Sequence, residues 1–92
     1  RYDGAPSNAL SGAYGSILPA IWSFMVAARE RALGTCWTTV HLMYEREASE
    51  ILKIPYDEYT QVAMVPIAYT KGTDFRPAAR KDLDQFIHRN EW

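Results

Sequence analysis

The chain has 92 residues, of which 48% are hydrophobic and 13% aromatic, and its formal net charge at pH 7 is −1. This length suits one small domain, and the apolar content excludes an intrinsically disordered chain. The near-zero charge gives no electrostatic reason to expect nucleic acid or a membrane as a partner. The single cysteine, Cys36, cannot form an intramolecular disulfide, so we expect a reducing, cytoplasmic compartment.

Residues 1–12 have the composition of a loop, because two glycines, a proline and an asparagine punctuate them. The first residue is Arg1 rather than a methionine, and no pattern of a signal peptide follows it. We therefore expect the chain to be a piece of a longer protein.

Apolar residues at helical spacing predict a helix from about Ser16 to Leu33. Ser16 is the expected cap, Pro19 belongs in the first turn, and Gly34 is the expected C-terminal cap. The strongly apolar part, Ile17–Ala28, has twelve residues, whereas a membrane span needs about 20.

This helix is apolar on every side, since Leu18, Trp22 and Val26 occupy the face opposite the main apolar stripe. A helix of this kind is usually buried. A chain of 92 residues offers little protein to cover it, so the pattern predicts an obligate oligomer.

Two strands and a second helix follow. Residues Thr35–Val40 are rich in β-branched and aromatic types and predict a strand, and Cys36 is expected to be a small buried residue there. A helix is expected from about Tyr44 to Leu52, ending before Pro55, with its apolar side inward and its glutamates in solvent. The apolar run Thr60–Tyr69 predicts a strand buried on both faces, with Pro66 at an edge or bulge, and a polar tail follows it.

Three groups of residues, in order along the chain, resemble the nitroreductase family. The first comprises Ala27–Arg29 and the Leu-Gly-Thr-Cys-Trp sequence at Leu33–Trp37. The second pairs the Leu-Lys-Ile-Pro sequence at Leu52–Pro55 with Val65–Tyr69. The third is the tail segment Arg80–His88. The similarity covers roughly residues 12–92, so residues 13–92 are expected to be the C-terminal half of such a domain.

The resemblance implies an α+β fold in which two chains intertwine and bind FMN at their interface. It implies an oxidoreductase in which NAD(P)H reduces the flavin and the flavin reduces a nitro, quinone or similar small acceptor. The expected partner is a second copy of the chain or a missing N-terminal half, which in the family supplies much of the FMN phosphate and ribityl site. The isolated chain is therefore expected to bind FMN weakly if at all.

The resemblance also implies site residues. Thr38, Thr39 and Val40 match the stretch whose backbone lies along the flavin ring, where an N–H donor would tune the cofactor. Arg80 matches the arginine that reaches the FMN phosphate, and Arg76 is a second basic candidate. No catalytic acid or base is proposed, because hydride transfer depends on positioning.

The sequence departs from the family pattern at several positions. Alanine stands at Ala32 and Ala68 where the family often has glycine, Trp22-Ser23 stands where it often has Gln-Asn, and Asp82 replaces a proline. We expect these differences to affect packing and substrate preference.

Simpler alternatives remain for each candidate. Arg80 also fits a solvated surface charge, and Thr38 and Thr39 also fit a plain strand. Cys36 and His41 lack a second pair at zinc spacing, so no metal site is expected. An alternative function is a flavin-binding or dimerisation module without turnover.

Overall fold

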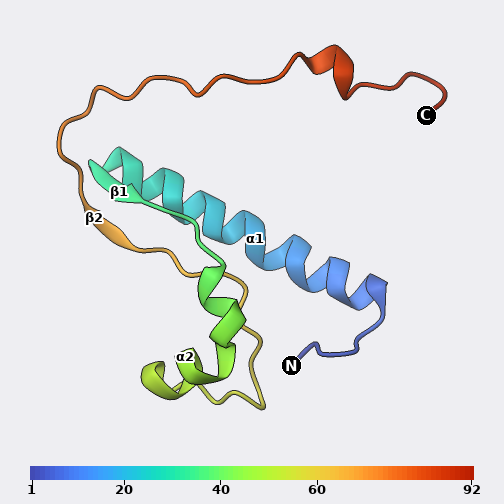
Figure 1. Ribbon diagram of the computed structural model, residues 1–92, viewed down its shortest axis with the longest axis vertical. Coiled ribbons are helices and arrows are strands. Elements are labelled where there is room, and N and C mark those ends of the chain that lie inside the picture. The colour runs from blue at the N-terminus through green and yellow to red at the C-terminus, as the bar shows by residue number, and fades with distance from the viewer.

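The computed structural model describes residues 1–92 and shows an α+β chain with two α-helices, two short strands and two 3-10 helices (Figure 1). The α+β class expected from the sequence is confirmed. In chain order the elements are α1 (Ser7–Glu30), β1 (Leu33–Thr35), η1 (Val40–Tyr44), α2 (Glu45–Leu52), β2 (Ile67–Tyr69) and η2 (Leu83–Gln85).

Helix α1 begins nine residues earlier than the sequence predicts. The extended residue Pro6 precedes it, and the carbonyl of Pro6 accepts hydrogen bonds from the amides of Ala9 at 3.0 Å and Leu10 at 3.1 Å. The expected loop over residues 1–12 is therefore wrong from Ser7 onward, and Ser16 is not a cap. Pro19 lies inside the helix, where its ring nitrogen cannot donate a hydrogen bond.

The C-terminus of α1 also differs from the prediction. The helix ends at Glu30, and Ala32 takes the left-handed conformation, with φ of 58°, that glycine usually supplies at this place. The expected glycine cap is thus wrong, because Gly34 lies in β1. The departure from the family pattern at Ala32 falls on the residue that turns the chain.

Strands β1 and β2 form a two-stranded antiparallel sheet that lies along the C-terminal half of α1 (Figure 1). We call this strand pair the hairpin below, although η1 and α2 lie between the two strands in the chain. Gly34 pairs with Ala68. A Cβ atom at Gly34 would lie 2.6 Å from the methyl carbon of Thr70, so any larger residue here would force the Thr70 side chain to move. An isolated bridge between Thr38 and Met64 continues the pairing.

The predicted strands are longer than the observed ones. Ordered pairing covers Leu33–Thr35 and Ile67–Tyr69, while Val40 begins a 3-10 helix. All three residues of β2 are exposed, so the expectation that this run is buried on both faces is wrong for the single chain. Pro66 immediately precedes β2, and its carbonyl accepts a hydrogen bond from the amide of Cys36 at 3.3 Å, a contact that does not need the donor which proline lacks.

The second helix is confirmed within one residue, since α2 spans Glu45–Leu52 and Lys53 ends it in a left-handed conformation. Its burial differs from the prediction. Ile51 and Leu52 are exposed, whereas the buried residue is Ser49, at 2% relative exposure. Glu45, expected in solvent, is largely buried at its side chain.

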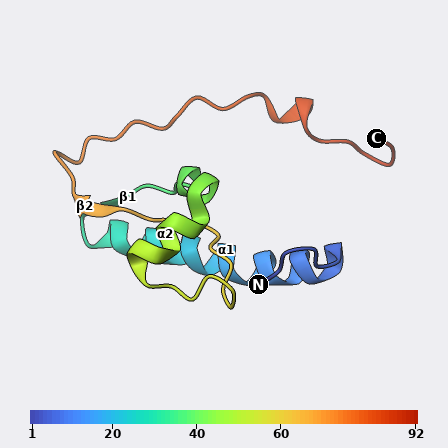
Figure 2. The same cartoon turned by 60° about the horizontal axis from the view of Figure 1, so that its bottom comes forward.

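Beyond Phe75, which contacts Arg29 of α1, the tail runs away from the rest of the chain in both views and contains only η2 (Figures 1 and 2). Its large apolar residues are exposed, and the C-terminal Trp92 is fully so, although its ring stacks on His88.

The chain as a whole buries very little. Only Ala28 and Ser49 count as buried. The radius of gyration is 17.3 Å, whereas a compact domain of this length has about 12 Å. These values agree with the expectation that the chain needs a partner to cover its apolar surface.

Helix α1 is long and apolar enough, by length and composition alone, to cross a membrane. The core helix of a globular protein passes the same test. The expectation that no segment reaches this length was based on the twelve residues Ile17–Ala28, and the 24-residue helix exceeds it.

Candidate functional site

The five site residues predicted from the sequence lie in two separate places. Thr38 and Thr39 lie between β1 and η1, and Val40 is the first residue of η1. Arg76 and Arg80 are exposed residues of the tail, which runs apart from the body of the chain (Figure 2). The single chain therefore does not bring the two groups together.

The segment around Thr38 is held by backbone pairing. The amide of Thr38 donates to the carbonyl of Met64 at 3.0 Å, and the amide of Met64 donates back to the carbonyl of Thr38 at 2.9 Å. The Thr38 backbone is thus fully used inside the chain, so it fixes the segment and leaves ligand contacts to its neighbours.

The amides of the next two residues are free, or almost free, to donate a hydrogen bond to a ligand. The amide of Thr39 has no hydrogen-bond acceptor in the chain, and that of Val40 has only a long contact of 3.4 Å to the hydroxyl of Thr38. Both residues are exposed. An exposed, unpaired backbone N–H is the kind of donor that a flavin ring requires, so these residues fit the role that the resemblance implies.

A polar network that the sequence analysis missed lies next to this segment. Glu45, the first residue of α2, accepts hydrogen bonds from the Arg1 guanidinium, at 3.2 Å and 2.8 Å on its two oxygens. The same guanidinium donates to the carbonyls of Tyr56 and Tyr59 at 3.0 Å and is bonded to Asp3.

Gln61 completes the network. Its amide donates to a carboxylate oxygen of Glu45 at 2.9 Å, and its side-chain nitrogen donates to the carbonyl of Glu45 at 3.1 Å and to the hydroxyl of Ser49 at 2.8 Å. The one signal in the sequence was a polar residue near the start of the apolar run Thr60–Tyr69.

The network changes the acidity of its carboxylates. Hydrogen bonds from the Arg1 guanidinium, supported by the amide of Gln61, hold the pKa of Glu45 below its usual value against the opposing effect of burial. The same guanidinium lowers the pKa of Asp3. Both side chains are therefore stabilised in the charged form.

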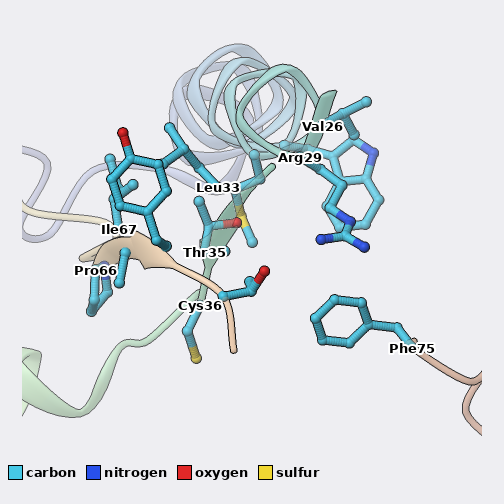
Figure 3. A pocket seen from close by; sticks show the side chains of 14 residues that line it. Val26, Arg29, Leu33, Thr35, Cys36, Pro66, Ile67 and Phe75 are labelled. Atoms are coloured by element: carbon cyan, nitrogen blue, oxygen red, sulfur yellow. The ribbon is translucent and has the colours of Figure 1, made fainter. Parts of the chain in front are cut away.

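A broad apolar hollow of about 640 Å³ lies between the C-terminal part of α1 and the hairpin (Figure 3). Arg29 is its only charged residue, and the Arg29 guanidinium lies 4.3 Å from the centre of the Phe75 ring. None of the five predicted site residues lines it. The lining residues are Trp22, Met25, Val26, Arg29, Leu33, Gly34, Thr35, Cys36, Pro66, Ile67, Ala68, Tyr69, Thr70 and Phe75.

The structure also shows the surroundings of Cys36 and His41, which the sequence analysis considered as a possible metal pair. Cys36 is exposed, so the expectation of a buried residue is wrong. Both ring nitrogens of His41 are buried without a hydrogen-bond partner. The structure contains no group of three or more potential metal ligands.

Comparison with known proteins gives one match. The chain matches the family model described as "Nitroreductase family" over residues 2–69, a range that includes α1, both strands, Thr38–Val40 and the network apart from Arg1. No curated protein and no solved structure matches. The third group of residues in the resemblance, in the tail, lies outside the matched range. Because the match covers well over half of the chain, this protein belongs to the nitroreductase family, whose function is that of flavin-dependent oxidoreductases.

Proposed function

We propose that the chain forms part of an FMN-dependent NAD(P)H oxidoreductase that reduces nitro, quinone or similar small acceptors. The observation that carries this proposal is the family match over residues 2–69. The unpaired amide of Thr39 supports it, because an exposed donor lies within the stretch that resembles the family's flavin-contacting backbone.

In this proposal, the amides of Thr39 and Val40 donate to the flavin ring, and Arg80, with Arg76 in support, binds the phosphate. The flavin would supply the redox chemistry, taking hydride from NAD(P)H and passing electrons to the acceptor. The protein contributes positioning and electrostatics, so no side chain acts as an acid or base.

The separation of the two groups of residues favours assembly of the site from two copies. In one chain, the tail with Arg76 and Arg80 runs away from η1 (Figure 1). The exposed apolar residues of α1 and the low burial of the chain also favour a homodimer, or association with further polypeptide of the same fold. We interpret α1 as a helix of that interface rather than a membrane span, because the family match includes it.

Arg80 provides the test of the phosphate site. Replacing Arg80 with alanine removes a charge-assisted contact worth about 1.5–3 kcal/mol, so FMN should bind about ten- to a hundredfold more weakly. Arg80→Lys should recover only part of the loss, because lysine keeps the charge but lacks the bidentate fork. The measurement is titration with FMN followed by flavin fluorescence, extended to millimolar flavin because binding to this chain is expected to be weak.

Arg89→Ala is the matched control, since Arg89 is another exposed arginine of the tail. Equal loss of affinity in Arg80→Ala and Arg89→Ala would assign the effect to general charge. Unchanged affinity in a folded Arg80→Ala chain would make Arg80 an ordinary surface residue and move the phosphate site to Arg76.

The alternative is a flavin-binding or dimerisation module without turnover, which the incomplete site in the single chain favours. Oxidation of NADH or NADPH in the presence of FMN and a quinone distinguishes the two. Flavin binding without NAD(P)H oxidation, in a chain shown to be dimeric, would support the module.

A further inference from the structure

The segment that carries the unpaired amide of Thr39 has few apolar contacts to hold it. Val40, Met43 and Tyr44 are exposed to 70%, 78% and 64%. Apart from each other, η1 and α2 have no helix or strand as a close neighbour. Within η1 only His41 and Leu42 are half-buried, so hydrogen bonds contribute much of what fixes the position of the segment.

Those hydrogen bonds come from one short stretch of chain. At one end of the segment, Thr38 is paired with Met64 through two backbone bonds. At the other end, Glu45 is bonded to Gln61 through its carboxylate and its carbonyl. The four residues 61–64 thus hold both ends of residues 38–45, and we call this arrangement the brace.

Gln61 is the side chain on which the brace depends. Its side-chain nitrogen spans the first turn of α2, because it reaches both the carbonyl of Glu45 and the hydroxyl of Ser49. Ser49 is the most buried residue of the chain, and its hydroxyl in turn donates to the carbonyl of Glu45 at 2.8 Å. The Gln61 side-chain nitrogen, the Glu45 carbonyl and the Ser49 hydroxyl are thus bonded to one another within the chain, so the arrangement forms without a ligand.

We propose that Gln61 is a positioning residue for the flavin ring, acting through the brace to fix the direction in which the Thr39 amide points. The inference rests on the proposed function for its ligand, but the brace itself is independent of any ligand. A hydrogen-bond donor that already points toward the ligand site does not have to be reoriented when the ligand binds. A looser brace should therefore weaken the hydrogen bond to the flavin, although no atom that touches the flavin is removed.

The test uses Gln61→Glu, which keeps the shape of the side chain and removes its donors. In the flavin-free chain, exchange of the hydrogen-bonded amides of residues 42–44 in η1 should become about tenfold faster, while exchange in α1 stays unchanged. Ser49→Ala, which removes the buried acceptor, should act in the same direction. Gln85→Glu makes the same chemical change in the exposed tail and is the matched control.

The second readout is the proton resonance of the Thr39 amide during titration with FMN. In the wild-type chain it should move downfield as the amide donates to the ring. In Gln61→Glu the shift at saturation should be smaller, whereas in Gln85→Glu it should equal that of the wild type. A role confined to folding would leave this limiting shift unchanged.

The outcomes separate the two proposals. Unchanged exchange over residues 42–44 in Gln61→Glu would overturn the brace. Faster exchange with an unchanged limiting shift at Thr39 would overturn the positioning role. FMN-induced shifts that appear elsewhere in the wild-type chain but not at the Thr39 amide would overturn the ring contact in the proposed function, and the positioning role with it.

Discussion

The α1–hairpin unit (α1, β1 and β2) and the α2 unit (η1, α2 and residues 53–64) are stabilised by different interactions. In the α1–hairpin unit, large apolar side chains such as Trp22, Phe24 and Val26 are exposed to 62%, 47% and 54%. In the α2 unit, the central contacts are hydrogen bonds among polar groups, and the one fully buried side chain is Ser49.

This difference shows which unit depends on a partner. Apolar surface is stabilised only when something removes it from water, and one chain supplies little cover for α1. Hydrogen bonds around Glu45 and Gln61 are already complete within the chain. Dissociation of an oligomer should therefore loosen the first unit and leave the second largely intact.

The largest effect is expected from charge on the exposed face of α1. The wild-type chain should be a dimer or larger at micromolar concentration, as measured by light scattering. Trp22→Glu removes an exposed aromatic residue of α1. At the proposed interface such a residue contributes about 2 kcal/mol or more, so the dissociation constant of the oligomer should rise at least about thirtyfold.

Ser16→Glu adds the same charge at an exposed polar position of α1 and should change the dissociation constant little. A wild-type chain that is a cooperatively folded monomer under these conditions would contradict the comparison, because α1 would then be stable without cover.

A smaller effect is expected when acidification weakens the hydrogen bonds that stabilise the α2 unit. The folded-state pKa of Glu45 is lowered chiefly by Arg1, so its charged form stabilises the fold above the usual pKa near 4.5. This contribution is lost as pH falls below 4.5 through the lowered value, and Asp3 on the same guanidinium titrates in the same direction. The thermal midpoint should drop by several degrees over this window.

Glu45→Gln is the informative variant, because glutamine cannot lose a charge on acidification. Its thermal midpoint should be lower than that of the wild type at pH 7 and should fall less between pH 6 and pH 3. An equally steep fall in both proteins would assign the acid sensitivity to other carboxylates. Glu91→Gln, in the exposed tail, is the control.

The smallest effect is expected at the turn between α1 and β1. Ala32 has a left-handed φ of 58°, which costs an alanine about 1 kcal/mol more than a glycine. Ala32→Gly should therefore raise the free energy of unfolding by about 0.5–1 kcal/mol. Ala27→Gly, in the exposed interior of α1, should lower it by a similar amount. Destabilisation by both changes would show that the turn is not strained.

The sequence predicted elements where local chemistry decides them. Helical spacing from Ile17 to Ala28 indicated α1, and Pro55 limited α2 at the correct place. The start of α1 was predicted wrongly, because glycine and proline before Ser16 suggested a loop. Pro19 is tolerated inside the helix, where local rules expect it only in the first turn.

The candidate site was predicted only in part, and through resemblance rather than periodicity. The resemblance points to the segment Thr38–Val40, but no sequence pattern predicts that the amide of Thr38 is bonded to Met64 while that of Thr39 is unpaired. Glu45 was assigned to a solvated helix face, since glutamates on a short helix usually point into water. The role of Gln61 was not predicted at all.

By itself, the sequence determined the α+β class, the apolar helix and the family, and it predicts a partner, because these follow from composition, spacing and ordered motifs. Only the tertiary structure decided which amide is free and what holds it in place. The bonds between Glu45 and Gln61 join residues 16 apart. Their existence depends on the path that the chain takes between them, which no local pattern encodes.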